Sequence, residues 1–171
     1  MADLNTAFPP SVPSLAAVIR AWRLVKSRYA SVAFDGEGAR LYGGRWNSRG
    51  TLVAYASDSV ALAALEVIVH LQSTGVLASY SLASLQFPDE SVEDVDASAL
   101  PKIWRTYPAP PELQAIGDQW VKDVRTAVLR VPNAIIPSAH NYLLNPAHPE
   151  FANATVDQPQ AFDFDPRLLR F

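Results

Sequence analysis

Glycine is concentrated in one segment of this chain, and that segment limits how its neighbours can fold. The chain has seven glycines in 171 residues, and five of the seven lie between Phe34 and Gly50. Glycine adopts positive φ values and lets two pieces of backbone approach closely. We therefore expect a loop or tight turns across residues 34–50. Apolar runs on either side, residues 21–25 and 51–56, predict two strands.

The second of these strands leads directly into a predicted helix. Ser57, Asp58 and Ser59 offer capping oxygens, and the apolar pattern predicts a helix over residues 60–72. Its apolar side chains lie nearly all around the helix axis, a pattern typical of a largely buried helix.

Glu66 is the only charged side chain between Val60 and Val69. An isolated carboxylate in apolar surroundings is unfavourable unless it is paired or used. One interpretation is structural, because Glu66 and His70 are spaced to share one face of the helix as its polar stripe. The other is functional, since a buried carboxylate is a candidate acid, base or hydrogen-bond acceptor.

The remaining pattern predicts a single compact α+β domain. Hydrophobic residues make up 49% of the chain and charged residues 18%, which is typical of a packed core. Pro9, Pro10 and Pro13 predict a loose leader over residues 1–14, with the domain spanning residues 15–171. Further strands are predicted at 79–87, 126–131, 134–136 and 155–164, a second helix at 112–125, and turns at 141–149.

Composition excludes or disfavours several kinds of site. The absence of cysteine excludes disulfides, thiolate catalysis and cysteine–zinc sites. A formal net charge of −3 argues against direct nucleic-acid binding. With no recognisable signal peptide or membrane-length apolar run, we expect a cytoplasmic protein without membrane contact. His140 and His148 lack the spacing of a metal motif, and Ser138 lies outside a serine-hydrolase elbow.

Arginine outnumbers lysine by eleven to three. Arginine is favoured over lysine where phosphate or carboxylate is bound by a planar, bidentate contact. Codon usage in a GC-rich genome would produce the same overall bias, but it explains local clustering less well. Six of the arginines fall within thirty residues: Arg20, Arg23, Arg28, Arg40, Arg45 and Arg49.

Within the glycine-rich segment, Arg40 and Arg45 are candidates to clamp a pyrophosphate. Tyr42 and Trp46 are candidates to stack on a ring. The glycine spacing matches neither a dinucleotide fingerprint nor a P-loop, and a set of purely structural turns would explain the same composition.

Tyr55 ends the strand that follows this segment, one helix before Glu66. Arg45, Tyr55 and Glu66 are therefore expected to meet at one edge of the sheet. The alternative for Tyr55 is an ordinary core tyrosine with its hydroxyl at the edge of the core.

Four ordered segments resemble the RES-domain family, a group of toxins named for Arg, Glu and Ser. They read FDGEGA at 34–39, GGRWN at 43–47, ALE at 64–66 and NYLLNPAHP at 141–149. The resemblance covers about residues 22–151 and implies an ADP-ribosyltransferase-like fold, with a mixed sheet and flanking helices. It also implies that NAD⁺ is the substrate and is cleaved at the nicotinamide–ribose bond, by hydrolysis or phosphorolysis, without a metal or separate cofactor.

The same resemblance implies a protein partner. Family members are usually encoded beside an Xre-family helix-turn-helix antitoxin that covers the active site. Contact with DNA would then come through this partner. We also expect a homodimer within the complex, because the apolar second helix (112–125) and its aromatic flank carry more apolar surface than one core can bury.

Functional residues carry over position by position. Arg45 matches the family arginine and would hold the pyrophosphate, with help from Arg23 or Arg40. Glu66 matches the family glutamate and would stabilise the positive charge that develops on the ribose. Tyr55 matches a recurring tyrosine and would pack against nicotinamide or ribose. Tyr42, Trp46 and Asn47 complete the expected NAD⁺-binding set.

The family serine has no direct match. The family commonly reads Val-Pro-Ser where this chain has Val131-Pro132-Asn133. Either Asn133 or Ser138, five residues later, is expected to orient the nicotinamide amide or a ribose hydroxyl.

Two other functions fit the same sequence. The first is transfer of ADP-ribose to a target protein, which would use the same residues. The second is a non-catalytic module that docks a partner through the acidic loop 90–96 and the segment near Trp104 and Tyr107.

Overall fold

The computed structural model describes residues 17–70 and 79–169. The strands are β1 (Val18–Lys26), β2 (Ala54–Ser57), β3 (Tyr80–Pro88), β4 (Val92–Asp94), β5 (Val128–Pro132), β6 (His140–Leu144), β7 (Thr155–Val156) and β8 (Gln160–Phe162). The α-helices are α1 (Glu37–Tyr42), α2 (Val60–His70) and α3 (Pro111–Lys122). Short 3-10 helices are η1 (Ser27–Val32), η3 (Asp89–Ser91), η4 (Ala97–Ala99), η5 (Pro149–Asn153) and η6 (Pro166–Leu169).

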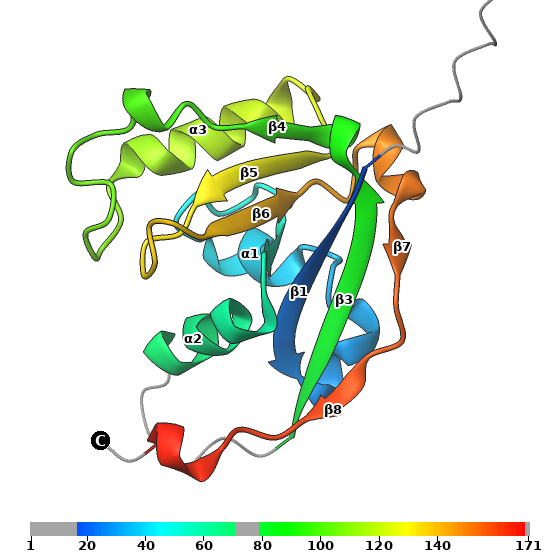
Figure 1. The fold of residues 1–171 in the computed structure, drawn as a ribbon. Helices are drawn as coiled ribbons and strands as arrows, with labels where there is room; N and C mark the ends of the chain where they lie inside the picture. Colours follow the sequence, from blue (N-terminus) through cyan, green and yellow to red (C-terminus); the bar gives the residue numbers. More distant parts are fainter. Residues whose placement is uncertain (1–16, 71–78, 170–171) are drawn as a thin grey trace, which may run out of the picture.

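The strands form one mixed sheet in the order β4-β5-β6-β2-β1-β3-β7, with β8 paired to the start of β3. Neighbouring strands are antiparallel except for β4, which runs parallel to β5. β1 and β2 are in register through one residue pair, Trp22 with Ser57. The sheet therefore consists of two halves that separate beside this junction, with the long β1–β3 ribbon on one side (Figure 1). The predicted α+β fold with a mixed sheet is confirmed.

Helix α2 starts immediately after β2, where Ser59 caps it. The Ser59 hydroxyl oxygen accepts a hydrogen bond from the Leu62 amide at 3.2 Å. Ala63 is buried and packs against Leu24 of β1, which fixes the helix beside the junction. Most other side chains of α2 are only partly covered, and Val69 is exposed. The prediction of a largely buried helix is therefore wrong, because only one side of α2 faces the sheet.

Helix α3 covers the half of the sheet that contains β5 and β6. Pro111 occupies its first turn, where a backbone amide needs no partner inside the helix. The buried face of α3 carries Leu113, Gly117 and Trp120. At Gly117, an added Cβ would lie 1.8 Å from the carbonyl oxygen of Trp46. Only glycine permits this approach between α3 and the glycine-rich segment.

Several sequence predictions of local structure need correction. Residues 34–50 contain helix α1, which begins after Gly36 at φ 79° and ends at Gly43, φ 74°. Residues 134–136 lie in the turn between β5 and β6 and form no strand. Strand β6 instead begins at residue 140 and occupies much of the segment predicted as turns. Pairing with β5 and β2 on both sides buries Leu143 and Leu144, and this burial outweighs the turn preference of the flanking Asn and Pro residues.

The predicted final strand over 155–164 is divided into β7 and β8. The predicted leader 1–14 and the last residues of the 60–72 helix lie outside the described residues. Across the described ranges, no helix is both long and apolar enough to cross a membrane.

The contact at Gly117 gives a first testable prediction. Replacing Gly117 with Ala should lower the free energy of unfolding by about 3 kcal/mol or more, because the new methyl group meets a backbone carbonyl that cannot turn away. Urea denaturation followed by circular dichroism measures this change. Gly38→Ala is the matched control, since an added Cβ at helical Gly38 has no atom within 4 Å. Equal stability of both variants would show that α3 does not press on the Trp46 backbone.

Candidate functional site

The carboxylate of Glu66 is held by two asparagine side chains. Asn133 Nδ2 donates a hydrogen bond to Glu66 Oε1 at 2.6 Å, and Asn141 Nδ2 donates to the same oxygen at 2.8 Å. The structural interpretation of a Glu66–His70 stripe is not what is found, because His70 Nδ1 lies 2.7 Å from the backbone oxygen of Glu66 rather than from its carboxylate. Glu66 therefore points from α2 towards the β5–β6 hairpin.

The hairpin presents both amides from fixed positions. Asn133 follows β5, and its Oδ1 accepts hydrogen bonds from the amides of Ile135 and Ile136, both at 2.8 Å. This arrangement is an Asx-type turn, which fixes the side chain. Asn141 lies in β6, in register with Val131 of β5 and Ser57 of β2. Backbone pairing on both sides therefore sets the position of its side chain.

Asn133, at the position where the sequence resemblance places the family serine, lies beside Glu66. Its side chain is fully buried and contacts Glu66 and the hairpin backbone. Ser138 lies exposed in the turn before β6, and no hydrogen bond joins its side chain to the described part of the site. The structure therefore brings Asn133, and not Ser138, next to Glu66, and contact of either residue with a ligand stays a prediction.

Arg45 lies on the same side of the molecule as Glu66. One nitrogen of its guanidinium, Nη1, donates to the carbonyl oxygens of Trp104 at 2.7 Å and Thr106 at 3.1 Å. Partial burial lowers the pKa of Arg45 below its ordinary value, and the charge of nearby Glu66 opposes that shift. Because both acceptors are neutral, the full positive charge of Arg45 stays uncompensated by a direct ion pair.

Tyr55 fixes the turn that carries Arg45. Its hydroxyl donates to Asn47 Oδ1 at 2.7 Å and accepts from the Trp46 amide at 3.1 Å. At Gly44, an added Cβ would lie 2.6 Å from the same hydroxyl. Burial raises the pKa of Tyr55 well above its ordinary value, so the hydroxyl remains protonated as a donor. Tyr55 therefore sets the position of the residues immediately before and after Arg45.

Helix α3 holds the same turn from its other side. Gln114 Nε2 donates to the Gly44 carbonyl at 2.9 Å, and Asp118 Oδ1 accepts from the Ser48 amide at 2.9 Å. Gly117 lies between these two residues on one face of the helix and accommodates the Trp46 carbonyl. Sequence reasoning missed this role of α3, although a glycine inside a helix, next to Asp118, was the available signal.

Arg23 is the second partly buried arginine near Tyr55. It follows Trp22 in β1, directly beside the junction between the two halves of the sheet. Burial lowers the pKa of its guanidinium, while the charges of Asp35 and Tyr55 oppose the shift. Its side chain forms no ion pair with any carboxylate in the described ranges, so its charge is also uncompensated.

Other arginines of the described residues are either ion-paired or exposed. Carboxylates pair with Arg20, Arg40, Arg125, Arg130 and Arg167. Arg23 and Arg45 differ because they combine partial burial with an unpaired charge. Two such cations near Tyr55, one of them also near the fixed carboxylate of Glu66, form a place where an anionic ligand would lower the free energy of the site.

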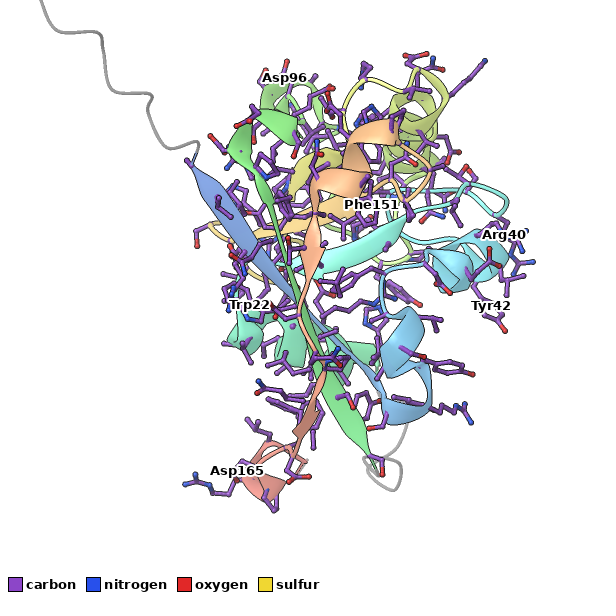
Figure 2. The ribbon with its side chains drawn as sticks, turned by 90° about the vertical axis from the view of Figure 1, so that its right-hand side faces the viewer. Trp22, Arg40, Tyr42, Asp96, Phe151 and Asp165 are labelled. Carbon is purple, nitrogen blue, oxygen red and sulfur yellow. The ribbon has the colours of Figure 1, made fainter. Side chains whose placement is uncertain are left out.

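Four residues expected to bind NAD⁺ lie elsewhere. Arg40 is exposed and pairs with Glu37 at 2.8 Å, and Tyr42 is 76% exposed. Figure 2 shows both on α1, with their side chains directed away from the body of the protein. Trp46 is only 2% exposed and packs in the core, so its ring offers no face for stacking. Asn47 is fully buried, and its Nδ2 donates to the carbonyls of Ala39, Ser48 and Thr51.

The described residues contain no group of three or more His, Asp or Glu side chains arranged to hold a metal ion. The charged groups found at the site are the carboxylate of Glu66 and the guanidinium groups of Arg45 and Arg23.

Comparison with known proteins assigns the family. Residues 20–165 match the family model of the RES domain. "Toxin Res" from Yersinia enterocolitica is 37% identical over 148 residues, covering 86% of this chain and 97% of the relative. "Prs ADP-ribosylating toxin" from Sphingobium is 38% identical over 154 residues, covering 87% and 96%. The chain belongs to the RES-domain family of toxins.

A solved structure confirms the fold. A chain in the crystal structure of the M. tuberculosis MbcT–MbcA toxin–antitoxin complex matches with a TM-score of 0.69 and 19% identity. The match covers 90% of this chain and 88% of that chain. The curled mixed sheet with its flanking helices is thus a fold that this family shares with a known toxin–antitoxin assembly.

The hydroxyl of Tyr55 gives the second testable prediction. Tyr55→Phe should lower the free energy of unfolding by about 1–3 kcal/mol, because Asn47 Oδ1 and the Trp46 amide lose a buried partner. Urea denaturation of the variant measures the loss. Tyr42→Phe, at the exposed position, serves as the control and should change stability by less than about 0.5 kcal/mol. A neutral Tyr55→Phe variant would contradict the role assigned to this hydroxyl.

Proposed function

We propose that this toxin binds NAD⁺ and cleaves the bond between nicotinamide and ribose. The observation that carries the proposal is a pair of partly buried arginines without an ion pair, Arg23 and Arg45, both near Tyr55, together with the fixed carboxylate of Glu66 near Arg45. NAD⁺ offers matching chemistry, with an anionic pyrophosphate next to a ribose that becomes positive when nicotinamide leaves.

In this proposal the two guanidinium groups hold the pyrophosphate by charge-assisted hydrogen bonds. Arg45 has Nη2 and Nε for this purpose, because Nη1 is bonded to the carbonyls of Trp104 and Thr106. The substrate is then oriented by two cations that meet it from β1 and from the glycine-rich turn.

Glu66 acts on the developing charge. As the nicotinamide–ribose bond breaks, its electron pair leaves with nicotinamide, which departs neutral, and positive charge grows on the ribose. A carboxylate beside the ribose stabilises that oxocarbenium-like state. Glu66 Oε1 accepts the hydrogen bonds from both Asn133 and Asn141, so Oε2 is the oxygen available to the sugar. Water then adds to the anomeric carbon and loses a proton to the solvent, or phosphate adds through one of its oxygens.

A second outcome is transfer of ADP-ribose to a protein. This candidate is favoured by the Sphingobium relative, whose name describes an ADP-ribosylating toxin. The first step would be the same, and only the acceptor of the ADP-ribose would differ.

Incubating the purified toxin with labelled NAD⁺ separates these outcomes. The reactions are run in plain buffer, with added phosphate and with cell lysate. Free ADP-ribose in plain buffer identifies hydrolysis, ADP-ribose phosphate in the presence of phosphate identifies phosphorolysis, and labelled protein in the lysate identifies transfer to a protein. Calorimetry with NAD⁺ provides the test against a non-catalytic module. A protein that neither binds nor consumes NAD⁺ under any of these conditions would contradict the proposal.

We further propose an antitoxin partner of the Xre family and action in the cytoplasm. The MbcT–MbcA structure supports a partner because it contains a toxin–antitoxin complex of this fold. Near the site, Tyr107 is 87% exposed and Ile103 is 59% exposed, which suits a protein contact. The acidic loop suits it less well, because Glu93 pairs with Arg125 and Asp94 with Arg130.

Kinetic variants give the third testable prediction. Glu66→Gln keeps the size of the side chain but removes its charge, so kcat for NAD⁺ consumption should fall by about 100-fold or more with little change in KM. Arg45→Lys keeps the charge but loses the planar guanidinium with its several N–H donors, so KM should rise by about 10-fold. Steady-state kinetics measure both parameters.

Arg40→Ala is the control for these variants, because Arg40 is exposed and paired with Glu37. It should leave kcat and KM within about twofold of the parent values. If Glu66→Gln consumed NAD⁺ at the parent rate, Glu66 would not be the group that stabilises the ribose.

A further inference from the structure

Asn141 carries a buried polar atom without a partner. Its Oδ1 is shielded from solvent and accepts no hydrogen bond from any described residue. A buried acceptor without a donor destabilises the folded state, and native proteins contain few of them. The same side chain donates to Glu66 through Nδ2 at 2.8 Å.

The orientation of this amide is decided by the carboxylate. If the amide were turned over, Oδ1 would face Glu66 Oε1 at about the same 2.8 Å, and two acceptors would meet without a hydrogen between them. The Nδ2 donor must therefore point to Glu66, which leaves Oδ1 at a buried position without a donor. Asn141 thus gives Glu66 a hydrogen bond while its own oxygen has none.

Packing alone does not explain an asparagine at this position. Asn141 lies in a strand with neighbours on both sides, in register with Val131 and Ser57. Asparagine is among the residues least favoured in strands, and an apolar side chain would leave no acceptor unpaired. Residues that break such local rules in native proteins are concentrated at functional sites.

We propose that Asn141 is a positioning residue for the reaction, acting through Glu66. Together with Asn133 it supplies two donors to Oε1, which fixes the rotation of the carboxylate and leaves Oε2 directed to the substrate. This inference rests on the proposed function, in which Glu66 stabilises the ribose. Neither asparagine touches the reacting atoms.

The role differs between the two asparagines. Asn133 Oδ1 also holds the hairpin turn by two backbone hydrogen bonds, so its loss would disturb the fold as well as Glu66. Asn141 has no second hydrogen bond from its side chain to the described residues. Asn141 is therefore the position at which support of Glu66 can be tested apart from stability.

The test combines kinetics with stability for Asn141→Ala. We expect kcat for NAD⁺ consumption to fall by about 10- to 100-fold with KM within about twofold, because a loosely held carboxylate is misplaced in the transition state. The midpoint of thermal unfolding should be equal to or above that of the parent, because the unpaired oxygen is removed with the donor. Asn153→Ala, at an exposed asparagine, is the matched control and should match the parent in both measurements.

A conservative variant separates the donor from the loss of the side chain. Asn141→Ser keeps a hydrogen-bond donor at this position, so it should retain more of the parent kcat than Asn141→Ala. An Asn141→Ala protein with parent kcat, or with a lowered unfolding midpoint that accounts for the lost activity, would overturn the proposal.

A crystal structure of Asn141→Ala keeps this test independent of the substrate. Glu66 should occupy more than one side-chain rotamer in the variant and a single one in the parent. If the parent protein consumes no NAD⁺, the proposed function fails, and the rotamers of Glu66 still decide whether Asn141 holds it. A single, unchanged rotamer in the variant would overturn the positioning role.

Discussion

The close contact between the Trp46 carbonyl and Gly117 brings the glycine-rich turn against α3, and the position of Arg45 depends on it. Gln114 and Asp118 bind the turn on either side of this contact, while Tyr55 holds it from the sheet. A turn fixed from both sides loses little further freedom when a ligand arrives, which favours binding. This rigid contact requires a glycine inside α3, and an interior glycine lowers the intrinsic stability of a helix.

The electrostatics of the site follow from where charge is left unpaired. Several surface arginines pair with carboxylates, whereas Arg23 and Arg45 are partly buried without an ion pair, and Glu66 is held by neutral amides. Neutral partners orient a charge without cancelling its field. Both signs of charge therefore remain available to a ligand, as the proposed cleavage of NAD⁺ would require.

The sequence singled out candidate site residues, but it did not predict which of them contact one another. Glu66 was identifiable because it is alone on an apolar helix, and Arg45 because of its glycines and its family match. Trp46 and Asn47 were expected to face a ligand but are buried, since a motif shows that residues belong together but not which of them face inwards. Asn141 was missed as a partner of Glu66 because its segment is rich in Asn and Pro. The pairing that makes this segment a strand comes from its hairpin neighbour β5 and from β2, which is distant in sequence.

Arg45 is anchored to the segment around Trp104 and Thr106 through carbonyl oxygens alone. Every amino acid supplies the same carbonyl, so the anchor places little demand on which side chains stand there. Side chains on the outward face of this segment, including Ile103 and Tyr107, can therefore change while the carbonyl acceptors of Arg45 stay in place. The identity of the exposed surface and the anchoring of the arginine are thus independent properties of the same few residues.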